Sequence, residues 1–207
     1  MSRELRLETS RGPVTIIARA APEQVADLVF DEGIGVFSQF RSLLTKVESL
    51  YRWAEDPDSD IAVAVHEGSR IVGFCVRRPP EAGERWAEMD PPILYEIFGE
   101  TSRNFRDQKL MKPLTRELAL APENEDRILY IVGYSWHWDL DYSRKTLTQY
   151  RDTIIHLLTP LGFKQYPTNE PNVSLRSENL FMARIGANLA RPIKRRFTNL
   201  LFGIVDD

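Results

Sequence analysis

The stretch GYSWHWDLDYS (133–143) gathers side chains that can do acid–base chemistry. His137 and Asp139 alternate there with Trp136 and Trp138, and the whole chain has only three histidines and four tryptophans. If the stretch continued a strand, His137 and Asp139 would share one face of it. An imidazole beside a carboxylate titrates near neutral pH and can take a proton from an ammonium group. The alternative is that the tryptophans pack in a core or at its rim, while His137 bonds a backbone carbonyl.

Two further candidate bases lie in ILYEIFGET (93–101), a stretch that reads as a strand. Glu96 and Glu100 would share one face of that strand with the apolar side chain of Phe98. Apolar neighbours desolvate a carboxylate and raise its pKa toward a useful range. In the alternative, one or both carboxylates point into solvent at the strand end.

Composition and charge limit the classes of protein to consider. The 207 residues suffice for one substantial core, and the net charge of −3 is spread over interleaved acidic and basic residues, so we expect no nucleic acid partner. Cys75 is the single cysteine, which excludes an internal disulfide, and no His/Cys group has metal-ligand spacing. His137 and Asp139 alone are too few ligands, and we predict no metal site.

The hydropathy of the chain argues against a membrane protein. No apolar run approaches the roughly 18 residues that span a bilayer, and the N-terminal MSRELRLETS lacks the apolar core of a leader peptide. We expect a cytoplasmic protein with no membrane partner. The sequence does not predict an oligomeric state.

Two predicted hairpins and two predicted helices make up the N-terminal part of the chain. The hairpins lie at 5–16 and 61–78, where apolar and β-branched residues surround short turns. The second helix is the clearer one, because apolar residues recur every three or four positions from Val36 to Ala54. The segment 79–92 carries four prolines and no periodicity, which indicates a long loop.

The C-terminal part alternates between predicted strands and helices, and Pro113 falls in the first turn of the first of these helices. In order, the elements are a strand at 93–101, a helix at 109–120, a strand at 127–135, a helix at 147–158, and strands at 163–168 and 179–186.

This order of elements resembles the Gcn5-related N-acetyltransferase (GNAT) superfamily over nearly the whole chain. The Phe105-Arg106 pair that opens a helix and the stretch LTPLGFKQY (158–166) are similar to steps of that fold. More narrowly, SWHWDL, ERW (84–86) and the closing MARIG resemble the acetoin-utilisation acetyltransferases, the AcuA family.

The resemblance implies an α/β (α+β) fold with a mixed, mostly antiparallel sheet of about six or seven strands and about four flanking helices. The 93–101 and 127–135 strands would run parallel and splay apart at their carboxyl ends. We expect one domain over 1–190, followed by a tail at 191–207 that packs on it. The tail joins a basic run to apolar residues, so it could instead bind a partner or an acidic surface.

The resemblance also implies a reaction, the transfer of an acetyl group from acetyl-CoA to a primary amine such as a protein lysine. GNAT enzymes often carry a catalytic glutamate on the 93–101 strand, which favours Glu96 or Glu100 as the base, with His137 as the competing choice. Tyr142 could protonate the leaving thiolate, as could Tyr150, or either could simply pack. The residues implied to bind acetyl-CoA are Phe98, Thr101, Arg106, Gln108, Lys109, Leu110 and Met111, and those implied to bind the acceptor are Trp136, Trp138 and Asp139.

The predicted pyrophosphate loop departs from the family pattern. Its usual form has an Arg or Gln followed by glycines at alternate positions, because backbone N–H groups must approach the phosphates closely. Here Arg106 fits, but Asp107, Lys109 and Met111 replace the glycines. We therefore predict weak binding of acetyl-CoA. The alternative function is a GNAT-fold binding or regulatory module that has lost CoA binding and catalysis.

Overall fold

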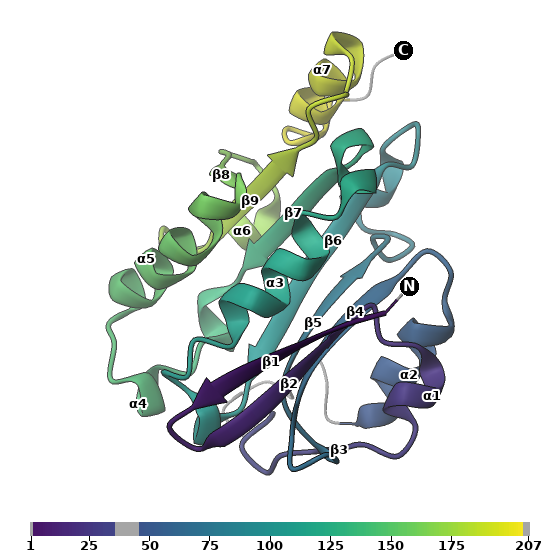
Figure 1. Ribbon diagram of the computed structural model, residues 1–207. Coiled ribbons are helices and arrows are strands. Elements are labelled where there is room, and N and C mark those ends of the chain that lie inside the picture. Colours follow the sequence, from purple (N-terminus) through teal and green to yellow (C-terminus); the bar gives the residue numbers. More distant parts are fainter. Residues whose placement is uncertain (1, 36–45, 205–207) are drawn as a thin grey trace. The chain divides into compact units, whose positions relative to one another are not determined.

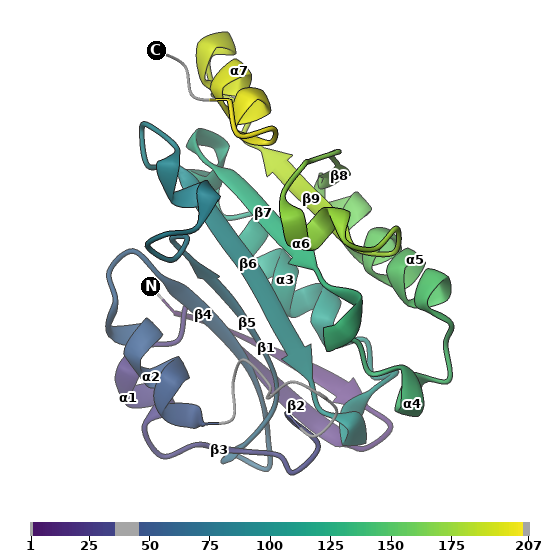
Figure 2. The ribbon, with the colours of Figure 1, turned by 180° about the vertical axis from the view of Figure 1, so that it is seen from behind.

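A computed structural model describes residues 2–35 and 46–204 of the chain (Figure 1 and, from behind, Figure 2). Contacts divide the chain into two compact units. The first unit comprises Met1–Arg78 and Ile97–Ala119, and the second comprises Pro79–Glu96 and Leu120–Asp207. The apolar positions Val36, Phe37, Phe40, Leu43 and Leu44 of the predicted second helix lie outside the described residues. The prediction of a single domain over 1–190 stays a prediction.

The strands form a mixed, mostly antiparallel sheet, as predicted. Their hydrogen-bonded order is β1-β2-β4-β5-β6-β7-β9-β8, with β3 paired to β5. Only β3–β5 and β6–β7 are parallel among the described pairs with a defined register. The strands are β1 (Arg3–Thr9), β2 (Gly12–Ala18), β3 (Val29–Phe30), β4 (Asp60–His66), β5 (Arg70–Arg78), β6 (Leu94–Thr101), β7 (Ile128–Gly133), β8 (Lys164–Gln165) and β9 (Leu180–Ile185).

The described residues contain more elements than the sequence predicts, because short ones escape periodicity. They form nine strands and seven α-helices, but β3 and β8 have two residues each, and α1, α4 and α6 have four each. The helices are α1 (Pro22–Val25), α2 (Val47–Glu55), α3 (Met111–Ala119), α4 (Leu140–Ser143), α5 (Leu147–Leu158), α6 (Pro171–Ser174) and α7 (Arg191–Leu200). Both predicted hairpins form, as β1–β2 and β4–β5.

Helices cover both faces of the strands in the first unit. Side chains alternate along each strand, so successive residues pack against helices on opposite faces. Ile61, Val63 and Val65 of β4 join the apolar cluster that α1 and α2 complete through Val25 and Leu50. Helix α3 packs on the opposite face of these strands and contacts β2, β4 and β5. In Figures 1 and 2, α3 and the α1–α2 pair accordingly lie on opposite sides of these strands. The helix predicted at 109–120 is therefore confirmed, with Pro113 in its first turn.

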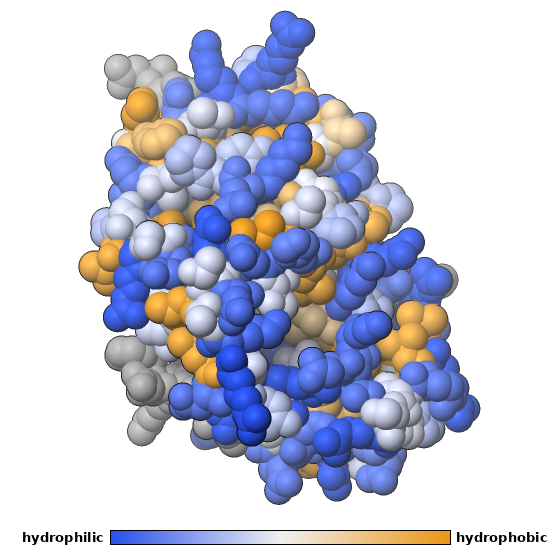
Figure 3. Space-filling model, turned by 90° about the vertical axis from the view of Figure 1, so that its left-hand side faces the viewer, coloured by the Kyte–Doolittle hydropathy of each residue, from blue (hydrophilic) through white to orange (hydrophobic). Residues whose placement is uncertain are grey.

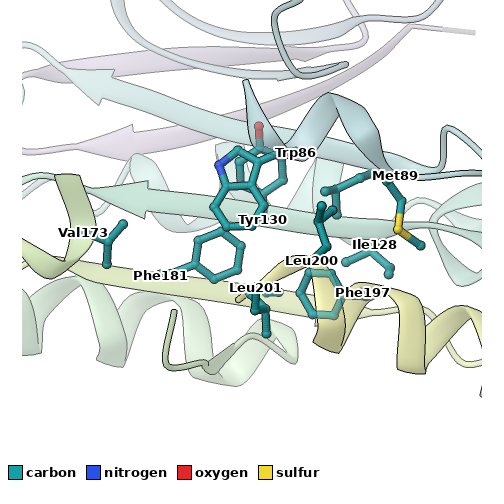
Figure 4. Close-up of a cluster of buried hydrophobic side chains, with 11 residues drawn as sticks. Trp86, Met89, Ile128, Tyr130, Val173, Phe181, Phe197, Leu200 and Leu201 are labelled. Atoms are coloured by element: carbon teal, nitrogen blue, oxygen red, sulfur yellow. The ribbon is translucent and has the colours of Figure 1, made fainter. Parts of the chain in front are cut away.

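The second unit has an aromatic core on one face of β7 and β9. Tyr130 and Phe181 project from these strands and stack with ring centroids 5.7 Å apart, and Trp86 covers both of them (Figure 4). The C-terminal helix α7 adds Leu200 and Phe197, which is fully buried, and Leu201 follows directly after the helix. Phe197, Leu200 and Leu201 of the C-terminal segment thus belong to this core, whereas Phe202 and Ile204 are exposed.

None of the helices in 2–35 and 46–204 is both long and apolar enough to cross a bilayer. The face of the molecule seen in Figure 3 is mainly hydrophilic, and its hydrophobic side chains gather only in small patches.

Candidate functional site

The loop that joins β6 to α3, residues 102–110, keeps the backbone shape that glycines usually provide. Asp107 and Lys109 have φ angles of +63° and +58°, in the left-handed region that non-glycine residues seldom occupy. These are two of the positions that are glycine in the family pattern. The glycines are absent at these positions, but Asp107 and Lys109 adopt a backbone conformation that glycine readily provides.

Backbone N–H donors lie at the end of this loop and at the start of α3. Within the described part of the chain, no residue accepts a hydrogen bond from the backbone N–H groups of Lys109, Leu110, Met111 or Lys112. The side chains of Asp107 and Lys109 are exposed, and the Met111 Sδ lies 3.3 Å from where a Cβ on Gly99 would stand. Unbonded N–H groups at a helix start suit a phosphate, so this loop fits the CoA pyrophosphate despite its side chains.

Asp31 holds the start of the 102–110 loop in place by hydrogen bonds. This carboxylate is 3% exposed, and its Oδ1 accepts hydrogen bonds from the Ser102 hydroxyl, the Asn104 amide at 2.9 Å and the Gly33 N–H at 3.0 Å. Burial would raise the pKa of Asp31, but these three hydrogen bonds and the nearby Arg70 guanidinium together hold it below its ordinary value. The carboxylate stays charged and fixes the start of the loop.

The β1–β2 hairpin holds the other end of the loop. The Gln108 side-chain oxygen accepts hydrogen bonds from the Ser10 N–H and hydroxyl, both at 2.9 Å. Phe105 is buried with its ring centroid 4.9 Å from that of His66, and the Arg11 guanidinium lies 6.0 Å from the Phe105 ring. Gln108, predicted to bind cofactor, is thus engaged in shaping the loop.

The carboxyl end of β6 carries three more predicted residues. Phe98 meets Trp53 edge to face at 5.5 Å, and the Arg78 guanidinium lies 5.4 Å from both rings. Glu100 is half-buried and its Oε1 accepts the Gly35 N–H at 2.7 Å. The Thr101 hydroxyl is buried and has no hydrogen-bond partner among the described residues.

The pairing of β6 with β7 supports the predicted parallel arrangement. Leu94, Tyr95 and Glu96 pair in register with Ile128, Leu129 and Tyr130, and the pairing ends there although both strands continue. Glu96 therefore stands at the last paired position of β6. It is half-buried.

The prediction of a strand over 127–135 is wrong at its end. β7 stops at Gly133, and residues 134–139 form a turn around a 3-10 helix at Ser135–His137. The Ser135 N–H bonds the side-chain oxygen of buried Asn179 at 2.8 Å instead of a neighbouring strand. His137 and Asp139 consequently do not share a strand face.

The second half of this 134–139 turn is buried and structural. The Trp138 ring stacks on Tyr150 at 5.3 Å, and both Trp138 and Asp139 are buried. Asp139 caps α4 by accepting the Tyr142 N–H at 3.3 Å. The side chain of Tyr142 is 47% exposed. These contacts match the packing alternative for Trp138, and its role in acceptor binding stays a prediction, as does that of Asp139.

The first half of the turn carries a half-buried aromatic group. Tyr134 and Trp136 stack with centroids 4.8 Å apart, and the His137 ring meets both edge-on at 5.9 and 6.0 Å. Arg176 lies 6.0 Å from the Trp136 ring. Burial lowers the pKa of the half-buried His137, so its imidazole is neutral and can accept a proton at pH 7.

Carboxylates surround Tyr134. Burial raises the pKa of its hydroxyl to about 12, and the charges of Glu170, Glu84 and Glu96 act in the same direction. Glu84 also accepts a hydrogen bond from the Tyr130 hydroxyl at 3.4 Å. We name Glu84, Glu96 and Glu170 the acidic group. An acidic group beside aromatic rings favours a cationic ligand such as an ammonium.

The structure thus divides the predicted residues between the units. Glu96, Trp136 and His137 fall in the second unit with the acidic group, whereas Glu100 and the 102–110 loop fall in the first. Sequence reasoning missed Asp31, Ser10 and Asn179, whose partners are far away in the chain, and it missed Glu170. Only ERW (84–86) gave a sequence signal for Glu84.

Known proteins are similar to this chain in sequence and fold. The chain is 29% identical over 197 residues to the acetoin utilization protein AcuA of Bacillus licheniformis, covering 95% of this chain and 92% of that one. It superposes on the crystal structure of an acetoin utilization protein from Exiguobacterium sibiricum with a TM-score of 0.89 and 28% identity, over 98% and 94% of the two chains. No family model matches the chain.

A more distant structure shares the fold alone. It is a putative acetyltransferase of Salmonella typhimurium with its cofactor acetyl-CoA, at a TM-score of 0.56 and 14% identity, over 86% of this chain and 97% of that one. The predicted resemblance to GNAT proteins, and to AcuA among them, is confirmed.

Proposed function

We propose that this chain, a GNAT-fold relative of the AcuA proteins, is an N-acetyltransferase that uses acetyl-CoA as its acyl donor. The observation that carries the proposal is the left-handed backbone at Asp107 and Lys109, ahead of the unbonded N–H groups that open α3. Non-glycine residues cost roughly 1–2 kcal/mol each in this conformation, so other interactions must hold it. Asp31 and Gln108 supply them.

Donor binding falls to the first unit in this proposal. The N–H groups of residues 109–112 hold the pyrophosphate, and the Arg106 guanidinium adds a charge-assisted contact. Bound acetyl-CoA supplies the thioester that the acceptor attacks. The exposed side chains of Asp107 and Lys109 extend into solvent, so they leave the backbone donors accessible.

Acceptor binding falls to the second unit. The acidic group attracts a positively charged amine, and the rings of Tyr134 and Trp136 can flank its aliphatic stem. A lysine side chain has both features. We propose a protein lysine as the acceptor, consistent with the resemblance to protein acetyltransferases.

Glu96 is the proposed base. It takes a proton from the ammonium, directly or through a water, and the free amine then attacks the thioester carbonyl. Glu100, whose carboxylate accepts the Gly35 N–H, does not belong to the acidic group and is the weaker candidate. His137, neutral at pH 7, is the second choice. Collapse of the tetrahedral intermediate expels the thiolate, which Tyr142 can protonate.

Calorimetric titration with acetyl-CoA tests the donor half of the proposal. We expect saturable binding that weakens about tenfold or more in Arg106→Ala, because one hydrogen bond to a charged phosphate is worth roughly 1.5–3 kcal/mol. Arg116→Ala, on the exposed side of α3, is the matched control and should bind normally. No binding by the unaltered chain would favour a GNAT-fold module without CoA.

A further inference from the structure

A hollow of about 240 Å³ opens in the second unit at β8, β9 and α7. Its polar lining consists of Lys164, Tyr166 and Lys194, and its apolar lining includes Ala183, Ile185 and Ala187. It contains no residue of the 102–110 loop, of the 134–139 turn or of the acidic group. It is therefore built from residues that the proposed acetyl transfer does not use.

Strand register brings these side chains to one face. Lys164 of β8 pairs directly with Ala183 of β9, so the two side chains point the same way. Tyr166 lies two residues after Lys164, and Ile185 lies two residues after Ala183, so both share that face. The ring of Tyr166 meets Phe197 of α7 edge-on at 5.6 Å, which holds the helix, and with it Lys194, beside the same face.

The hollow is positively charged, because the charged residues of its lining are Lys164 and Lys194. No lining residue is acidic. Among the described residues, nothing forms a hydrogen bond or ion pair with the side chains of Lys164, Tyr166 or Lys194. Helix α7 adds Arg191, Arg195 and Arg196 and carries no acidic residue. Two ammonium groups around one hollow repel each other, and an anion between them would relieve that repulsion.

Glu125, which bonds the lining residue Ala187, does not serve this purpose. Glu125 accepts the Ala187 N–H at 2.9 Å and pairs with the Arg184 guanidinium. The Ala187 hydrogen bond, followed by that of Arg184, holds the pKa of Glu125 below its ordinary value. Its charge is thus already compensated by groups other than the two lysines.

The third polar group is a donor. Burial raises the pKa of the Tyr166 hydroxyl, which keeps it protonated at neutral pH. A phenol next to two ammonium groups presents only favourable contacts to an oxyanion.

We propose that this hollow binds a small phosphate monoester, with the phosphate held by Lys164, Lys194 and the Tyr166 hydroxyl and the organic part over Ala183 and Ile185. Lysines act as point charges, which suits a tetrahedral dianion, whereas planar carboxylates favour the arginine fork. The volume of about 240 Å³ lies below the roughly 300–1,000 Å³ of drug-sized sites, so the ligand is small.

Titration with phenyl phosphate, followed by amide chemical shifts of the full chain, tests this proposal. We expect shifts at Ala183, Gly186 and Ala187 that persist when acetyl-CoA is saturating. Lys164→Gln and Lys194→Gln should each weaken binding about tenfold or more. Arg195→Gln removes an exposed charge from the same helix without touching the hollow, and it should weaken binding less than about twofold.

Matched ligands separate the contributions of charge and ring. Benzoate keeps the ring but carries one negative charge, and inorganic phosphate keeps the charge without the ring, so both should bind more weakly than phenyl phosphate.

Three outcomes would overturn the proposal. Shifts confined to residues 109–112 would mean that the probe binds only the loop before α3. Equal losses in Arg195→Gln and the two lysine variants would mean a general electrostatic attraction to α7. A phosphoserine peptide that bound far more tightly than phenyl phosphate would assign the hollow to a protein partner instead of a small molecule.

Discussion

The 102–110 loop and the 134–139 turn reach their shapes by different means. Polar side chains from distant segments fasten the loop, chiefly Asp31 and Ser10. Ring stacking holds much of the turn, with Trp138 on Tyr150 and Tyr134 on Trp136, and one buried hydrogen bond joins Ser135 to Asn179. Hydrogen bonds are directional, so the loop keeps an unfavourable backbone at defined positions. Stacked rings tolerate small displacements, which suits a surface that must admit an incoming side chain.

This difference assigns tasks to the two regions in the proposed reaction. A rigid set of backbone donors suits the invariant pyrophosphate, whereas an aromatic and acidic surface suits an amine that arrives on a larger molecule. Variants of each region should therefore fail in different ways. Variants of the loop should weaken the binding of acetyl-CoA, and variants of the turn should raise the KM for the acceptor.

Glu96→Gln carries the largest expected effect. Loss of the base should lower kcat by roughly 10²–10⁴, while acetyl-CoA binding and the melting temperature stay near those of the unaltered protein. Steady-state kinetics with a lysine-containing acceptor measures it. Glu84→Gln, in the same acidic group, is the control and should mainly raise the acceptor KM. If His137→Gln abolished turnover and Glu96→Gln did not, the base would be His137.

Asp31→Asn should damage the loop and the fold together. The substitution weakens hydrogen bonds from Ser102, Asn104 and Gly33, and we expect a loss of about 1–3 kcal/mol in the free energy of unfolding, with weaker acetyl-CoA binding. Denaturant titration and calorimetry measure these effects.

The pH dependence gives a second readout on Asp31. Because folding lowers the pKa of Asp31, its stabilising contribution is complete above the unfolded pKa of about 3.9 and is lost as pH falls through the folded pKa. The variant should therefore lose less stability on acidification than the unaltered protein. An identical acid profile in both proteins would contradict this account.

Asn179→Ala tests the turn. It removes the acceptor of the Ser135 N–H and the donor to the Asn172 carbonyl at 2.7 Å. Leaving a buried donor unpaired costs about 1–3 kcal/mol, and we expect a loss of that size in the free energy of unfolding. The acceptor KM should rise while acetyl-CoA affinity stays constant. Weaker acetyl-CoA binding would show that the two regions are not separable as proposed.

Lys109→Gly has the smallest and opposite effect. Glycine relieves the left-handed strain but gains freedom in the unfolded chain, so the net gain in unfolding free energy should be at most about 1 kcal/mol. Lys112→Gly, in the first turn of α3, is the matched control and should cost up to about 1 kcal/mol. Destabilisation by both variants would mean that the strain at position 109 is already relieved by contacts of its side chain.

Local patterns predicted the elements better than they predicted the site. The β4–β5 hairpin, α3 and α5 follow from alternation and helical spacing, which are local signals. The turn after β7 could not be predicted in this way, because Asn179 intercepts the Ser135 N–H from a different strand end. Continuing the strand through His137 was the natural and wrong extrapolation.

The loop illustrates the opposite limit. From Asp107 and Lys109 the sequence predicts crowding and weak acetyl-CoA binding, since their side chains would hinder the close approach of the backbone to the phosphates. The compensating contacts come from distant parts of the chain. Ser10 lies 98 positions from its partner Gln108, and Asp31 lies 73 positions from its partner Asn104. A single sequence carries no signal for such pairings. The predicted weak binding remains to be measured.

The contact between Ser10 and Gln108 has a practical consequence for anyone who shortens or tags this protein. The β1–β2 hairpin lies at the end of the strand order and resembles a dispensable extension. Its tip nevertheless bonds the loop proposed to hold acetyl-CoA. An N-terminal deletion that leaves a soluble protein could therefore abolish activity for a purely architectural reason, and its inactivity would say nothing about the catalytic residues.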